Sequence, residues 1–251
     1  MSYTMTISPD FKPDLISGWY IFNTWLQKQS DVAIHINLVN DFSELAQCID
    51  NDSIDLIYAN PCDIAKLVRE KSFEALVKPV GVHDETVVIT HADNPINAIE
   101  SLKPSLKLAM TDVPDVNTMG TIMLEPADIN SCDIEAIICS NYITVAKKVV
   151  AGEADIGFLL ADAYNEFSSL VKKQVKPLIT SKIDVLHHAL LLGPNLQDKK
   201  SLLQKCLIMM ADDTKGMAIL NSMEIEKWEL MEQDEAEILI DLIDTLSPYS
   251  N

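Results

Sequence analysis

The sequence predicts an α/β fold with largely parallel sheets, built as two similar lobes. Strand-like and helix-like segments alternate through most of the chain, which is typical of α/β proteins. One unit also occurs twice, as "AQCIDNDSIDLIYANPCDI" at residues 46–64 and "AKKVVAGEADIGFLLADAY" at residues 146–164. A chain of 251 residues suits two lobes of about 100 residues each. The repeat therefore suggests that each lobe contains one copy of the unit.

The first part of the chain alternates regularly. Residues 13–29 are predicted to be helical because their apolar side chains recur near a 3.6-residue period. Asp41 or Ser43 can cap a second helix over 41–50, and Pro61 stands near the first turn of a third over 60–71. The predicted strands are 3–8, 32–39, 54–59, 74–82 and 85–91.

The second part repeats the alternation and then becomes helical. The predicted strands are 106–111, 134–140, 154–160, 175–181 and 187–194. Helices are expected at 117–128, at 141–153, which ends near Gly152, and at 161–173. From Asp198 onward every segment looks helical, over 198–213, 215–223 and 234–246.

Two strand-like crossovers, "VHDETVV" and "LHHALLL", predict lobes that are discontinuous in sequence. We expect residues 1–84 and 190–251 in lobe one and residues 85–189 in lobe two. Ligands of open α/β sheets bind outside the carboxyl ends of strands. Facing lobes would therefore line a central ligand cleft, with one copy of the repeated unit in each wall.

Composition argues against several classes of partner. The net charge of −19 argues against nucleic acid and anionic membranes as partners. No apolar run reaches the ~18 residues that span a bilayer.

The start, "MSYTMTISPDFKPD", lacks a secretory signal, so the chain as it stands is expected in the cytoplasm, or in the periplasm if a signal was removed. Five cysteines without CxxC spacing favour buried thiols over zinc or disulfides.

Motifs for catalysis are missing from the sequence. It contains no GxGxxG, Walker-type loop, GxSxG or HExxH, so neither an enzyme nor a bound cofactor or metal is expected. His83, Asp84 and Glu85 lie together at the first crossover and leave an enzyme open as an alternative. Adjacent strand residues point to opposite faces, so a single contact from Glu85 to a cationic or zwitterionic ligand is favoured over a carboxylate pair.

Candidate ligand residues lie at the ends of predicted strands. In "YANPCD" and "FLLAD", Tyr58 and Phe158 occupy equivalent places and are either ligand-contacting aromatics or core residues. Asp55 and Asp155 are expected to orient the turn into each strand. In "TDVPDVNTMGTIML" a helix is predicted to begin near Thr118, with free amides that can receive an anion.

The order of these motifs resembles the phosphonate/phosphite-type periplasmic substrate-binding proteins of ABC transporters. The resemblance rests on "SELAQCIDNDSIDLIYANPCDIAKLVRE", "NTMG…EPADI", "VAKKVVAGEADIGFLLADAY" and "MMADDTKGMAIL", and covers nearly the whole chain. It implies the two-lobed type II periplasmic-binding-protein fold. It also implies a solute-binding protein whose partners are a small oxyanion or zwitterion and an ABC permease or sensor protein. A ligand-free interaction module on the same scaffold is a further alternative.

The family typically has Ser-Thr-Ser-Gly where this chain has "NTMG", and often a His where this chain has "NY" at 141–142. The anion loop is therefore altered, with Met119 in place of a hydroxyl. The predicted ligand-binding residues are Ser8, Pro9, Tyr58, Asn60, Glu85, Asn117, Thr118, Met119, Gly120, Asn141, Tyr142 and Phe158.

Overall fold

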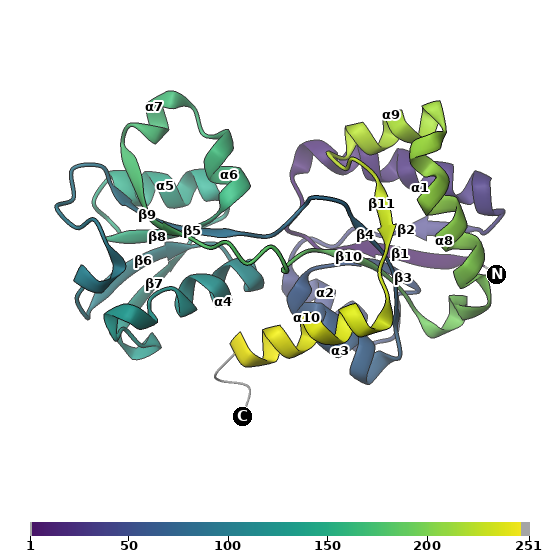
Figure 1. The fold of residues 1–251 in the computed structure, drawn as a ribbon, viewed down its shortest axis with the longest axis horizontal. Coiled ribbons are helices and arrows are strands. Elements are labelled where there is room, and N and C mark those ends of the chain that lie inside the picture. Colours follow the sequence, from purple (N-terminus) through teal and green to yellow (C-terminus); the bar gives the residue numbers. More distant parts are fainter. Residues whose placement is uncertain (1, 247–251) are drawn as a thin grey trace. The chain divides into compact units, whose positions relative to one another are not determined.

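Two β-sheets, each with helices on both faces, make up the computed structural model, which describes residues 2–246 (Figure 1). The backbone divides into two compact units. The first holds the residues up to His83 together with His187–Ile243, and the second holds Asp84–Leu186. The chain therefore leaves the first unit after His83 and returns to it at His187, while the end of α10 from Asp244 is grouped with the second unit.

The first unit contains a six-stranded sheet in the order β11-β4-β10-β3-β1-β2. β1 pairs in parallel with β2 and with β3, whereas β10 runs antiparallel to both β3 and β4, and β11 antiparallel to β4. Its strands are β1 (Tyr3–Ile7), β2 (Ile34–Ile36), β3 (Leu56–Ala59), β4 (Glu74–Pro79), β10 (Ala189–Leu192) and β11 (Trp228–Leu230).

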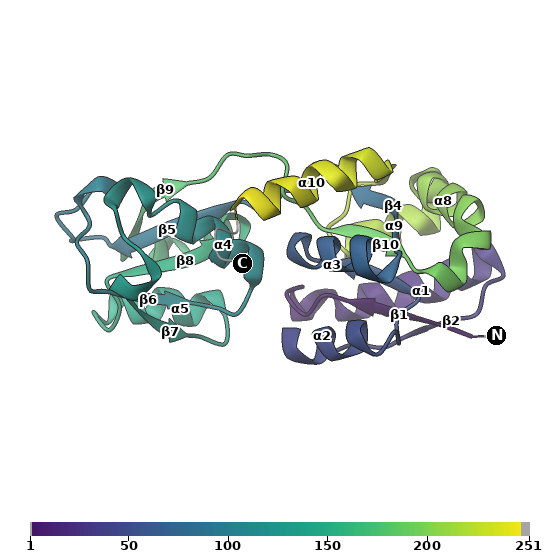
Figure 2. The same cartoon turned by 90° about the horizontal axis from the view of Figure 1, so that it is seen from below.

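Helices cover both faces of this sheet. α1, α8 and α9 lie on one face, while α2 and α3 lie on the other, which Figure 2 shows from below. The helices that begin in this unit are α1 (Ile16–Ser30), α2 (Phe42–Asp50), α3 (Pro61–Lys71), α8 (Lys200–Ile208), α9 (Thr214–Ser222) and α10 (Gln233–Leu246).

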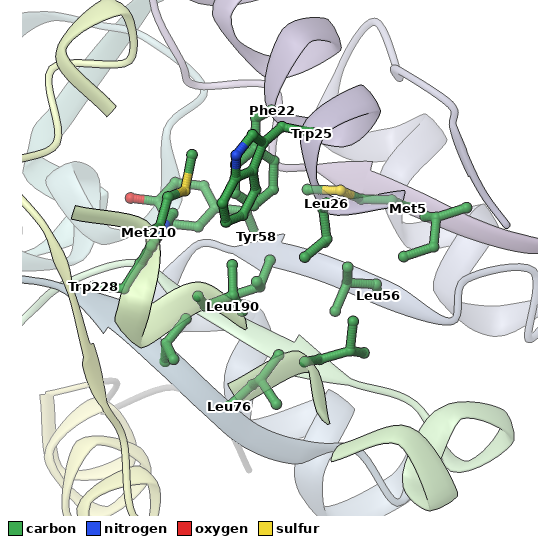
Figure 3. Close-up of a cluster of buried hydrophobic side chains, with 14 of the residues drawn as sticks. Met5, Phe22, Trp25, Leu26, Leu56, Tyr58, Leu76, Leu190, Met210 and Trp228 are labelled. Atoms are coloured by element: carbon green, nitrogen blue, oxygen red, sulfur yellow. The ribbon is translucent and has the colours of Figure 1, made fainter. Parts of the chain in front are cut away.

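The core of the first unit is an aromatic and aliphatic cluster between α1 and the sheet (Figure 3). Phe22 and Leu26 of α1 are fully buried and lie over Met5 and Leu56 of the strands. Each buried apolar side chain of this size contributes roughly 1.5–3 kcal/mol to folding. The same cluster includes Tyr58, so one candidate ligand residue is anchored in the core.

The second unit contains a five-stranded sheet in the order β7-β6-β8-β5-β9. β6 pairs in parallel with β7 and β8, whereas β5 runs antiparallel to β8 and β9. α4 and α5 lie on opposite faces of the sheet (Figure 1). The elements are β5 (Thr86–His91), β6 (Leu106–Met110), α4 (Pro114–Ile122), β7 (Ile134–Ile138), α5 (Tyr142–Val150), β8 (Ile156–Leu160), α6 (Ala161–Glu166), α7 (Ser169–Lys172) and β9 (Val175–Thr180).

The repeated aspartates have the same contacts in both units. Asp55 accepts a hydrogen bond on Oδ2 from the amide of Thr4 (2.8 Å) and donates its own amide to the Thr4 carbonyl (2.9 Å). Asp155 does the same with Lys107, at 2.8 Å for each bond. Each aspartate thus fastens the entry of one strand to its parallel neighbour.

Several predicted elements differ from the structure. The sheets are mixed rather than largely parallel, because β10 and β5 enter each sheet against the direction of their neighbours. The segment after Asp198 is not wholly helical, since 228–230 pairs with β4. The strand predicted over 32–39 forms a ladder only at 34–36, and the helix predicted over 161–173 is divided into α6 and α7.

Candidate functional site

In the first unit, the ends of β1 and β3 are joined by a chain of hydrogen bonds. The Ser8 amide donates to the Tyr58 carbonyl (2.9 Å), and the Ser8 hydroxyl accepts from the Asn60 amide (2.9 Å). Asn60 also caps α3, because its Oδ1 accepts from the Cys62 amide (2.9 Å). Ser8 and Asn60 are buried, and Pro9 after Ser8 is half-buried. The predicted residues of this edge therefore lie together.

This network extends to Asp10, which the sequence did not single out, and to His188 of the "LHHALLL" crossover. Asp10 Oδ2 accepts from Asn60 Nδ2 (2.8 Å) and from His188 Nε2 (3.0 Å). The Asp10 side chain is only 5% exposed and that of His188 is 13% exposed. Burial raises the pKa of Asp10, but the charge of His188 and the hydrogen bonds from His188 and Asn60 outweigh burial, so the pKa lies below its ordinary value.

Asp63 is a second acid influenced by Asp10; the residue is half-buried, and its Oδ2 atom is buried. It lies in the first turn of α3. Burial, with a smaller contribution from the negative charge of Asp10, raises its pKa to about 6; the positive charges of His188 and Lys66 oppose this shift. A carboxylic acid that titrates near neutrality often belongs to a functional site.

Tyr58 is held among aromatic rings. Its ring stacks on His188 at a centroid distance of 5.2 Å and lies 4.9 Å from Trp19 and 6.0 Å from Trp228. Figure 3 shows Tyr58 and Trp228 in the same buried cluster. The indole nitrogens of Trp19 and Trp228 are buried without a hydrogen-bond partner among the described residues. The Tyr58 ring thus has aromatic neighbours from three different segments of the first unit.

In the second unit, α4 begins at Pro114 and not near Thr118 as the sequence predicted. Proline fixes a helical φ and needs no amide partner at the first position, which makes Pro114 a better start than Thr118. Thr118 consequently lies inside the helix. The amides of the first turn, which have no partner within the helix, belong to Asp115 and Val116.

Asn117, a predicted residue of this region, makes a contact other than capping. Asn117 donates from Nδ2 to the Thr111 carbonyl (2.8 Å), so it ties α4 to the end of β6. The Thr111 hydroxyl and Asn117 Oδ1 are both buried, and neither has a hydrogen-bond partner within the described part of the chain. Unpaired buried polar atoms are costly, which makes these two groups candidates for further hydrogen bonding.

Three more predicted residues take part in packing. Met119 and Phe158 are 3% and 0% exposed. A Cβ added at Gly120 would lie 2.4 Å from the Phe158 ring, so only glycine fits against this side chain. The structure thus gives Phe158 and Gly120 a core role, and their contact with a ligand stays a prediction.

The remaining predicted residues lie at other turns. Asn141 caps α5 by accepting from the Thr144 amide (2.9 Å), and Tyr142 is half-buried at the start of that helix. The Glu85 carboxylate accepts from the Ser181 hydroxyl and from the amides of Ile183 and Asp184, both at 2.8 Å. Glu85 therefore joins the two crossovers of the chain, and its role as a ligand contact stays a prediction.

The sequence contained a signal for the residues that were missed. His187 and His188, at the second crossover, are not solvated, because both histidines are largely buried next to β10. "HHALLL" places them directly before a fully buried strand, and buried histidines need a polar partner. Asp10 follows a strand and Asp63 a helix cap, both at the sheet edge where ligands bind.

Solved structures of several known proteins share the fold of this chain. PhnD1 from Prochlorococcus marinus in complex with methylphosphonate is 13% identical, with a TM-score of 0.80 over 98% of this chain and 97% of that chain. The binding protein component of an ABC phosphonate transporter from Pseudomonas aeruginosa is 15% identical, with a TM-score of 0.77 over 98% and 85%. A Xanthomonas citri protein bound to ATP is 12% identical, with a TM-score of 0.79 over 100% and 99%. No curated protein sequence gives a match.

The fold and its sheet-edge polar residues define a two-lobed α/β solute-binding protein, which confirms the predicted fold class and general function. A family model for the phosphonate-type periplasmic substrate-binding proteins of ABC transporters matches residues 5–236. The chain belongs to this family, as its motifs suggested. In residues 2–246 no helix is long and apolar enough to cross a membrane.

Proposed function

We propose that the protein captures a small solute bearing an oxyanion, releases it unchanged, and serves an ABC permease. The observation that supports this most directly is the junction of β6 and α4. It combines the buried Thr111 hydroxyl, which has no hydrogen-bond partner among the described residues, with the N-terminus of α4. The positive end of the helix dipole favours an anion at the same place.

Asp115, which is 2% exposed, also lies in the first turn of α4. Thr118, one turn further along the helix and half-buried, remains a proposed contact through its hydroxyl.

The enzymatic alternative gains no support from the contacts of its key residue. Glu85 would have to act on a ligand, yet three donors of the second crossover already bind its carboxylate. We propose the periplasm as the place of action because the family is periplasmic.

The test begins with native mass spectrometry of freshly purified protein, followed by calorimetry with methylphosphonate, phosphate, sulfate and acetate. Thr111→Val and Thr118→Val remove a hydroxyl at nearly constant shape and should each weaken oxyanion binding about tenfold, or about 1.4 kcal/mol. Thr121→Val is the matched control, because its hydroxyl bonds to the Asn117 carbonyl within the same helix.

Two results would contradict the proposal. One is the absence of millimolar or tighter binding for every oxyanion, and the other is unchanged affinity in both Thr111→Val and Thr118→Val. Phosphorus NMR of methylphosphonate incubated with the protein should show the compound unconverted. Conversion that purified protein catalyses would favour the enzymatic alternative instead.

A further inference from the structure

A second site, different in chemistry, lies in the first unit at the carboxyl ends of β1 and β3. These two strands are parallel neighbours, so their carboxyl ends open at the same edge of the sheet. Asp10 follows β1, and Asp63 lies in the first turn of α3, which follows β3. His188 approaches the same place from the segment that enters β10.

Asp10 has one oxygen in use and one without a partner. The two hydrogen bonds that it accepts from other side chains, those of Asn60 and His188, arrive at Oδ2. Oδ1 is buried and has no hydrogen-bond partner among residues 2–246, although the side chain as a whole is only 5% exposed. A carboxylate in a site of this kind can accept further donors on its second oxygen.

Asp63 provides the second oxygen without a partner. Its Oδ2 is buried, and the described residues offer it no donor. The negative charge of Asp10 contributes to the raised pKa of Asp63, so the two carboxylates influence each other. Lys66 is the nearest lysine named for this group, but its ammonium bonds to the Asp50 carboxylate (2.5 Å).

The charges of this cluster do not balance within the protein. With Asp10 and Asp63 ionised, protonated His188 can supply one positive charge against two negative ones. Buried charges require partners that also form hydrogen bonds. The missing partner is therefore a cation that donates hydrogen bonds to Asp10 Oδ1 and Asp63 Oδ2.

The chemistry of the cluster distinguishes between kinds of cation. Among the described residues no group of three His, Cys, Asp or Glu side chains is placed to hold a metal ion. An ammonium group, in contrast, carries three N–H donors and needs only acceptors around it. The Tyr58 ring, stacked on His188, keeps the histidine in position beside Asp10.

We propose that Asp10 and Asp63 bind a primary ammonium group, which makes small amines a ligand class of this protein beyond the oxyanion site proposed above. Asp10 accepts through Oδ1 and Asp63 through Oδ2. The site requires both carboxylates in the ionised form. Asp63, with its pKa of about 6 in surroundings that include Asp10, His188 and Lys66, therefore makes amine binding weaken as the pH falls below 6.

Carbon NMR of the side-chain carboxyl groups tests the site in the full chain. Ethylammonium chloride is the probe, with ethanol and sodium chloride at matched concentrations as controls. Ethylammonium should shift the carboxyl signals of Asp10 and Asp63, ethanol and sodium should not, and the dissociation constant should rise at pH 5. Asp63→Asn should weaken ethylammonium binding at least tenfold.

Asp162→Asn is the matched control, because Asp162 occupies the first turn of α6 after β8 and is exposed. It should bind ethylammonium as the unchanged protein does. Asp10→Asn should also lose binding, and circular dichroism checks its folding, since Asp10 holds Asn60 and His188. Asp63→Asn by itself decides the matter if Asp10→Asn does not fold.

Equal shifts from sodium or ethanol would overturn the proposal, as would ethylammonium binding that Asp63→Asn leaves unchanged. The two proposed sites fail separately. Loss of methylphosphonate binding in Thr111→Val concerns only the second unit, whereas loss of ethylammonium binding in Asp63→Asn concerns only the first.

Discussion

The two copies of the repeated unit agree where their strands begin and differ where they end. Asp55 and Asp155 make the same pair of bonds to the neighbouring strand. At the other end, β3 leads into Asn60, which caps α3 and binds Asp10, whereas β8 leads into Leu160, which gives α6 no side-chain cap. The start of the repeated sequence thus makes the same structural contacts in both halves of the fold, whereas its end makes different contacts in each.

The aromatic residues of the two copies show the same contrast. Tyr58 stacks on His188 at the polar edge of its sheet, while Phe158 is fully buried against Gly120. An equivalent place in the repeat thus lies at a polar sheet edge in one unit and within the apolar core in the other. Substitutions at paired positions should separate these roles.

The largest difference in the loss of stability is expected between the variants Phe158→Ala and Tyr58→Phe. Removing a fully buried ring costs about 3–5 kcal/mol, because the cavity beside Gly120 has no other side chain to fill it. Tyr58→Phe keeps the ring and should cost less than about 1.5 kcal/mol. Urea unfolding of both variants measures the difference, and equal losses would mean that the two rings have the same role.

Asp63→Asn should change how stability depends on pH. The folded pKa of about 6 lies above the ordinary value of 3.8, so Asp63 costs the protein nothing below about pH 4 and destabilises it as the pH rises through 6. At pH 7 the variant should be more stable by up to about 3 kcal/mol. The groups that act on Asp63 in this range are Asp10, His188 and Lys66.

Thermal unfolding of both proteins from pH 4 to pH 8 measures this effect. The exposed Asp162, in the other copy, supplies the control variant Asp162→Asn, which should follow the unchanged protein at every pH. A gain in stability from Asp63→Asn that is as large at pH 4 as at pH 7 would contradict the assignment to an ionised, buried carboxylate.

The smallest difference in the loss of stability is expected between the two aspartates at the start of the repeated sequence. Asp55→Ala and Asp155→Ala each remove a charged acceptor from a backbone amide and should each cost about 1.5–3 kcal/mol. Asp55 should cost slightly more, because it also accepts from Asn195 Nδ2 (2.9 Å). Chemical denaturation compares the two, and a large loss in only one variant would show that the shared contacts are not equivalent.

The sequence by itself determined the α/β class, the repeated unit and some of the helix ends. Asp41 caps α2 as predicted, because a cap depends on neighbours within one turn, whereas α4 begins at Pro114 and not near Thr118. Periodicity likewise identified most strands and helices, since it reflects which side of a segment is buried.

Only the tertiary structure decided how distant segments meet. β11 pairs with β4 across about 150 residues, and Asp10 meets His188 across 178. Nothing near Trp228 or Asp10 in the sequence specifies these partners, because such contacts arise from packing and burial of the whole unit. The cost of burying Asp10 and Asp63 likewise appears only once the chain has folded around them.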